Sequence, residues 1–148
     1  MTLNRQDDLS FHMRIPAKKC FANNVLLTLE GISDHFCFTE SSRDRIKKVL
    51  ETILLNSIDL FYQKELGLFD LQFSIYKNKL LILVEDFLLN AKDEIEHQES
   101  NNEAVKNMLK SVEELTDGMS ISEKKGCNSC YSLSFNVSFI NTNNEVPS

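Results

Sequence analysis

A strict alternation of apolar and polar residues near the end of the chain constrains the fold more than any other feature. From Tyr131 to Phe139 every second side chain is apolar, and the side chains between them are serine or asparagine. Successive side chains of a strand point to opposite faces of a sheet, so this segment predicts a strand with one buried face. A sheet with one apolar face needs a second layer of structure to cover that face.

The same period of two residues recurs earlier in the chain. It predicts a strand over residues 9–15, another over 69–75, and a more continuously apolar, central strand over 80–86. Residues 77–79 form a polar connection that is short enough to join the last two strands as a hairpin. Met119 and Ile121 predict one further short strand.

Between these strands the apolar residues follow a period of 3.6 residues, which predicts amphipathic helices. The first helix is expected over residues 17–36, and a second begins after the N-cap residue Thr39 and continues to Phe61. A third helical pattern covers residues 105–115. The acidic stretch from Asn90 to Asn102 is either a solvated helix or a mobile segment.

These elements predict an α+β protein, a two-layer sandwich of a mixed sheet with helices on one face. We expect one domain over residues 9–140, a flexible N-terminus over 1–8 and a disordered tail over 141–148.

Charge and hydropathy exclude several classes of partner. The 148 residues carry a net charge of −6, which disfavours binding to nucleic acid. No apolar run approaches the length of a membrane span, and the polar start of the chain is unlike a signal peptide. We therefore expect a cytoplasmic protein with no nucleic-acid or membrane partner. The basic residues of one short stretch are expected on the solvated face of a helix: Arg43, Arg45, Lys47 and Lys48.

Three segments resemble one known family. Arg14–Ala17, Leu26–Ile32, and Phe73–Tyr76 followed by Leu80–Asp86 are similar to the anti-sigma-factor serine kinases, members of the GHKL (histidine-kinase-like, Bergerat) ATPase superfamily. The resemblance covers about residues 11–140 and implies the histidine-kinase-like ATPase fold. It also implies partners, namely a sigma factor and an antagonist protein that is phosphorylated on serine.

The resemblance implies positions for catalysis and magnesium on the second helix. The family has a glutamate base there, followed four residues later by an asparagine that holds magnesium. In this chain Asn56 occupies the asparagine position, but Thr52 occupies the base position and cannot accept a proton at neutral pH. Glu51 is adjacent, yet it points about 100° around the helix.

The nucleotide motifs are also incomplete. Asp86 occupies the position of the aspartate that reads the adenine amino group, but Leu88 stands where the family has a glycine. The stretch that would receive the phosphates, Asn101–Met108, contains no glycine, and glycine is what lets backbone N–H groups approach a phosphate closely. The resemblance therefore implies a vestigial ATP site of Asn56 and Asp86, with no catalytic residue and no bound cofactor.

The resulting hypothesis is a degenerate anti-sigma-factor-like regulator, a pseudokinase that acts by protein–protein binding, with the 17–36 helix as its interface or as a homodimer contact. The alternative is an active serine/threonine protein kinase that binds ATP and Mg²⁺ through Asn56 and Asp86, with Glu51 as the base. A third option is a different small ligand in the same cleft.

Cysteines and histidines offer little further chemistry. Cys127 and Cys130 form a C-x-x-C pair without a second pair at metal-ligand spacing, so an incidental turn is favoured over a redox or metal role. His12, His35 and His97 are scattered over three segments and are expected at the surface.

Overall fold

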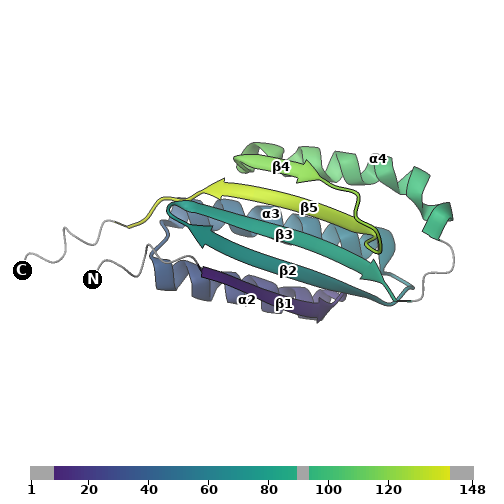
Figure 1. Ribbon diagram of the computed structural model, residues 1–148, viewed down its shortest axis with the longest axis horizontal. Coiled ribbons are helices and arrows are strands. Elements are labelled where there is room, and N and C mark those ends of the chain that lie inside the picture. Colours follow the sequence, from purple (N-terminus) through teal and green to yellow (C-terminus); the bar gives the residue numbers. More distant parts are fainter. Residues whose placement is uncertain (1–8, 90–93, 141–148) are drawn as a thin grey trace, which may run out of the picture.

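The computed structural model describes residues 9–89 and 94–140, and it confirms the α+β class (Figure 1). The strands are β1 (Leu9–Pro16), β2 (Gly67–Tyr76), β3 (Lys79–Leu88), β4 (Gly118–Ile121) and β5 (Ser129–Asn136). The helices are α2 (Lys19–Phe36), α3 (Glu40–Phe61) and α4 (Glu94–Val112), with a short 3-10 helix, η1 (Glu113–Leu115), after α4. The sheet has the order β1-β2-β3-β5-β4.

The expectation of a mixed sheet is wrong, because every pair of neighbouring strands runs antiparallel. Two helices, α2 and α3, connect β1 to β2. This pair returns the chain to the end of the sheet where β1 finished, so β2 runs back along β1. A single helix, α4, connects β3 to β4, which therefore run in the same direction, but β5 lies between them.

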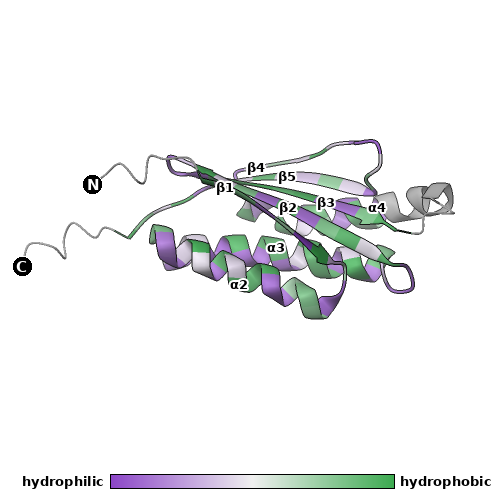
Figure 2. Ribbon diagram, turned by 60° about the horizontal axis from the view of Figure 1, so that its bottom comes forward, coloured by the Kyte–Doolittle hydropathy of each residue, from purple (hydrophilic) through white to green (hydrophobic). Residues whose placement is uncertain are grey.

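The helices cover one face of the sheet, and the core lies between the two layers (Figure 2). The alternating residues predicted to face inward along β2 and β5 are buried, as is the apolar stripe of α3. The largest fully buried side chains are Tyr131, Phe38, Phe69, Phe73 and Phe135. Among the described residues, no helix covers the other face of the sheet. Within the described residues, no helix combines the length and apolar character needed to cross a membrane.

Local chemistry explains where several elements begin and end. The Thr39 side chain accepts a hydrogen bond from the Ser42 backbone N–H at 3.3 Å, which confirms the predicted N-cap of α3. Lys77 adopts a left-handed conformation (φ 57°) in the predicted turn between β2 and β3. The last strand is shorter than predicted. It ends at Asn136, and Phe139 forms an isolated bridge with Phe38 instead.

The expected flexible N-terminus (1–8) and disordered tail (141–148) lie outside the described residues, as do residues 90–93. Of the two alternatives for the acidic stretch, residues 94–102 belong to α4 and are helical.

The basic stretch on α3 is only partly a solvated face. Arg43 donates to the backbone oxygens of Phe38 and Ser33, and Arg45 donates to those of Leu115 and Asn136. The two arginines therefore join α3 to the end of α2 and to the β4–β5 side of the molecule.

Candidate functional site

Asp86 lies near the end of β3 on the helix-covered face and is fully buried. Its Oδ1 atom accepts hydrogen bonds from the hydroxyl of Tyr62 at 2.6 Å and from the side-chain amide of Asn128 at 3.0 Å. The Asn128 backbone N–H also donates to the Asp86 backbone oxygen at 2.7 Å. Asp86 is thus held by the end of α3 on one side and by the β4–β5 connection on the other.

Tyr62 reaches Asp86 because Gly67 leaves room for its ring. Tyr62 is the C-cap residue of α3, and Gly67 begins β2. A Cβ atom at position 67 would lie 2.1 Å from Cε1 of Tyr62, far inside van der Waals contact. A residue with any side chain at position 67 would therefore displace the ring that covers Asp86.

The burial of this cluster changes the acidity of its groups. Burial raises the pKa of Asp86 to about 6, even though the hydrogen bonds from Tyr62 and Asn128 favour the charged form. Burial and the nearby negative charge of Asp86 raise the pKa of Tyr62. Burial also raises the pKa of Tyr131 to about 12. Three buried atoms have no hydrogen-bond partner among the described residues of this cluster: Asp86 Oδ2, Tyr131 Oη and Ser57 Oγ.

The magnesium and base positions on α3 are not joined to Asp86. The exposed Asn56 donates its side-chain amide to the backbone oxygen of Thr52 at 2.7 Å, one helical turn earlier. Within the described parts of the chain, no hydrogen bond joins Asn56 to Asp86. Thr52 and Glu51 are both half-buried on α3.

The stretch that the family resemblance assigns to the phosphates is not a turn at the start of a helix. Residues 101–108 lie inside α4, a single helix that begins at Glu94, and not at a turn that opens a helix. Inside a helix the backbone N–H groups are bonded to carbonyls one turn earlier, so they are not free to hold a phosphate. Leu88, at the glycine position after Asp86, is half-buried and packs against the core.

These observations together test whether the described residues fit ATP and Mg²⁺. One oxygen of Asp86 already accepts two hydrogen bonds and the other is enclosed, so this carboxylate does not reach an adenine amino group. Asn56 keeps its amide oxygen, the atom that would bind Mg²⁺, but it lies exposed on α3 with no hydrogen bond to Asp86. In this conformation the residues do not fit the nucleotide, and we derive no step through it.

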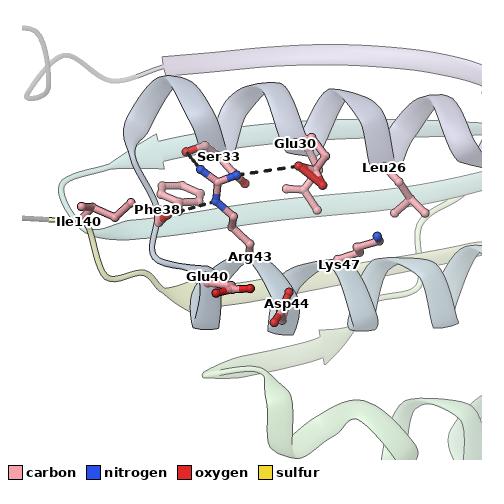
Figure 3. Close-up of a pocket in the computed structure, with 10 residues that line it drawn as sticks. Leu26, Glu30, Ser33, Phe38, Glu40, Arg43, Asp44, Lys47 and Ile140 are labelled. Atoms are coloured by element: carbon pink, nitrogen blue, oxygen red, sulfur yellow. Dashed lines mark hydrogen bonds and ion pairs between the residues drawn. The ribbon is translucent and has the colours of Figure 1, made fainter.

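A groove of about 390 Å³ lies elsewhere, between α2 and α3 (Figure 3). Leu26 and Glu30 line it from α2, Lys47 from α3, and Ile140 near one end. Arg43 crosses the groove, with ion pairs to Asp34 at 2.6 Å and to Glu30 at 3.9 Å on α2. None of the lining residues belongs to the predicted ATP site.

The open face of the sheet carries a row of charges. Asp70 of β2 and Glu85 of β3 are directly opposite each other, an arrangement that costs free energy unless cations compensate it. Asp70 is bonded to His12 and, at 2.8 Å, to Arg14, and Glu85 is bonded to Lys124 at 2.6 Å. Burial acts to raise the pKa of Asp70, but the hydrogen bonds from Arg14 and His12 outweigh it and lower that pKa.

The C-x-x-C pair lies beside this row. Cys130 is buried in β5, and its Sγ lies 3.8 Å from an oxygen of Glu85, while Cys127 is half-buried in the preceding connection. Burial, reinforced by the Glu85 charge, raises the pKa of the Cys127 thiol to about 11 and also raises that of Cys130. No three His, Cys, Asp or Glu side chains within residues 9–89 and 94–140 could hold a metal ion together.

We expect iodoacetamide at pH 7 to alkylate Cys20 first and Cys127 much more slowly, because the thiolate is the reacting species and burial suppresses it at Cys127. Cys20 is exposed on α2 and serves as the internal control. Peptide mass spectrometry over a time course measures both rates. Faster alkylation of Cys127 than of Cys20 would show a reactive thiol and contradict the prediction.

Two residues of the Asp86 cluster were not found from the sequence, namely Tyr62 and Asn128. Tyr62 ends a helix and Asn128 lies in a polar connection, so neither position has a periodic signal. The glycine five residues after Tyr62 was the available clue, since a glycine at the start of a strand indicates a close approach by another group.

The fold of the chain is similar to that of one class of proteins, and its sequence is similar to that of particular proteins in the class. Three helices on one face of a five-stranded antiparallel sheet are consistent with a GHKL-like ATPase fold. More particularly, the chain is similar to proteins named serine-protein kinase RsbW. Those of Bacillus thuringiensis (strain Al Hakam), Bacillus cereus (strain AH820) and Bacillus anthracis (strain A0248) are each 27% identical to it over 74 residues. The match covers 50% of this chain and 46% of each relative, so the chain matches about half the length of these curated relatives. No family model matches the chain.

Proposed function

We propose that the chain is a regulator of the anti-sigma type, which binds a sigma factor or its antagonist protein in the cytoplasm and does not hydrolyse ATP. The single observation that carries this proposal is the state of Asp86. The carboxylate that would read adenine is fully buried and is already bonded to Tyr62 and Asn128. The threonine at the base position and the glycine-free helix α4 support the same reading.

An active serine kinase is the second candidate, and the similarity to serine-protein kinases favours it. In that case Glu51 would act as the base, and Asn56 and Asp86 would bind Mg²⁺ and ATP. Tyr62 and Asn128 would have to release Asp86 before adenine could bind.

Isothermal titration with ATP and Mg²⁺ separates the two functions. We expect no binding heat up to roughly millimolar ATP. Any dissociation constant would then be weaker than about 1 mM, which corresponds to a binding free energy of about −4 kcal/mol. The B. cereus RsbW, under the same conditions, is the positive control. Micromolar binding that disappears in both Asn56→Ala and Asp86→Asn would overturn the proposal in favour of the kinase.

Binding to sigma factors tests the regulatory half of the proposal. Purified sigma factors and antagonist proteins encoded in the same genome are mixed with the chain and run by size-exclusion chromatography, with and without ATP. We expect one of them to co-elute equally well in both conditions. Binding that requires ATP, or no binding to any of them, would contradict the proposed function.

A further inference from the structure

Strand β3 has the sequence of a strand that is covered on both faces, but the described helices cover only one. Leu80, Ile82 and Val84 point toward the helices and are buried. Leu81 and Leu83 point to the open face of the sheet, which is turned toward the viewer in Figure 1, and Leu81 is 44% exposed. A near-continuous apolar run is typical of strands buried on both faces, whereas strands with one wet face alternate apolar and polar residues. The run in β3 therefore indicates that another element covers the open face.

The two leucines lie between polar side chains of the neighbouring strands. The residues opposite them in the register are Ser74 and Gln72 of β2, and Ser134 and Ser132 of β5. β2 and β5 thus alternate as strands with one wet face do, and β3 does not. Tyr76 ends β2 on the same face, is 53% exposed, and is the diagonal neighbour of Leu81. The apolar surface therefore runs from Tyr76 along Leu81 to Leu83.

The charged residues of this face enclose their carboxylates and present their cations to solvent. Asp70 and Glu85 are only 8% and 7% exposed. The side chains of Arg14 and Lys124, which form ion pairs with them, are 59% and 57% exposed. A molecule that approaches this face therefore meets the cations first.

Two further lysines lie beside the apolar surface. Lys79 is directly opposite Tyr76 in the register, and the Lys77 ammonium lies 5.2 Å from the centre of the Tyr76 ring. Together with Arg14 and Lys124 they give four cations against the two enclosed carboxylates, on a chain whose net charge is −6. This face is thus locally positive on a negative protein, and it favours an acidic partner.

We propose that the open face of the sheet binds an amphipathic helix of a partner protein, whose apolar stripe packs on Leu81 and Leu83 and whose acidic side chains meet the surrounding lysines and Arg14. A helix fits because the face of a sheet is covered by side-chain packing, and a helix with one apolar stripe supplies the missing layer. This assignment rests on the proposed function, since it names the surface and the chemistry by which the regulatory partner binds.

The affinity of the full chain for the sigma factor or antagonist protein that co-elutes with it, measured by isothermal titration, tests this assignment. Leu81→Ser removes apolar contact and Lys79→Glu reverses a charge, and we expect each to weaken binding by about tenfold or more. Leu27→Ser and Lys48→Glu make the same changes at exposed positions of α2 and α3. They are the matched controls and should bind like the wild type.

The outcomes separate this assignment from the proposed function. Wild-type affinity in both Leu81→Ser and Lys79→Glu overturns the assignment and leaves the proposed function intact, because the partner still binds. A loss confined to Leu27→Ser or Lys48→Glu has the same meaning, since it places the partner on the helical layer. A wild type that binds none of the sigma factors or antagonists contradicts the proposed function and this assignment together.

Two further measurements complete the test. Lys79 is exposed at the start of β3, so Lys79→Glu decides the question even if Leu81→Ser does not fold, and circular dichroism checks the fold of each variant. Co-sedimentation of the wild type with phosphatidylglycerol vesicles, lost in Lys79→Glu, would overturn the assignment by showing that this face binds an anionic membrane surface. We expect no co-sedimentation, because the net charge of −6 repels anionic lipid.

Discussion

The Asp86→Asn variant is expected to be more stable than the wild type at pH 7, by on the order of 2 kcal/mol. Burial raises the pKa of Asp86 to about 6, so at neutral pH the folded protein holds a carboxylate in a site that favours the neutral acid. Asparagine has the same shape and keeps an oxygen for Tyr62 and Asn128. The uncharged amide removes the buried negative charge, which is the source of the expected gain.

The pH dependence of the free energy of unfolding follows from the same raised pKa of Asp86. An unfolded aspartate loses its proton at about pH 4, and the folded Asp86 loses its proton only at about pH 6. Between these values the folded state binds more protons than the unfolded state, so the free energy of unfolding falls as the pH rises. Below about pH 4 and above about pH 6 Asp86 does not make the free energy of unfolding depend on pH. The difference between Asp86→Asn and the wild type should therefore develop between about pH 4 and pH 6.

Urea unfolding of both proteins at four pH values from 4 to 7 measures this difference. Asp70→Asn is the matched control on the neighbouring strand, and it should act in the opposite direction. The pKa of Asp70 is lowered, so Asp70 stabilises the fold at neutral pH, and this contribution is lost as the pH falls. An Asp86→Asn variant that is less stable than the wild type at pH 7 would contradict the prediction. It would show that the hydrogen bonds from Tyr62 and Asn128 to the charged carboxylate outweigh the cost of burying the charge.

The Gly67→Ala variant is expected to lose about 1–3 kcal/mol of stability, the usual cost of overpacking a core. Its Cβ would lie 2.1 Å from the ring of Tyr62, and relief of the clash moves the Tyr62 hydroxyl away from Asp86. Gly31→Ala is the matched control. It lies inside α2 with no atom near its Cβ position, and should gain about 0.5–1 kcal/mol from better helix propensity.

Thermal and urea unfolding of both alanine variants give the comparison directly. The same substitution at Gly67 in a Tyr62→Ala background should cost much less, because the ring that it would strike is gone. An equal cost in both backgrounds would show that the destabilisation has another origin, and that the contact between Tyr62 and Gly67 does not position the tyrosine over Asp86.

The periodicity of the sequence predicted most of the fold correctly. Strands β1, β2, β3 and β5 and the buried stripe of α3 lie where the alternating and 3.6-residue patterns placed them, because burial of one face acts on every residue of an element. The direction of the strands was not predicted correctly. Periodicity shows which face of a strand is buried, but the connections decide whether two strands run parallel.

The environment of Asp86 could not be predicted for a related reason. The sequence shows an acidic residue after an apolar strand, and the family resemblance suggests a role in adenine recognition. Its actual neighbours, Tyr62 and Asn128, lie 24 and 42 residues away in the chain. The vestigial ATP site of Asn56 and Asp86 stays a prediction, to be tested by titration with nucleotide.

The sequence by itself determined that this protein is an α+β fold in which amphipathic helices cover one face of a sheet, because local periodicity records which side chains avoid water. It also determined that residues 101–108, the stretch that the family resemblance assigns to the phosphates, contain no glycine. Only the tertiary structure decided that Tyr62 and Asn128 both donate hydrogen bonds to Oδ1 of Asp86 and that β1 lies at one edge of the described sheet. Both are contacts between distant segments, and their geometry depends on how the whole chain packs.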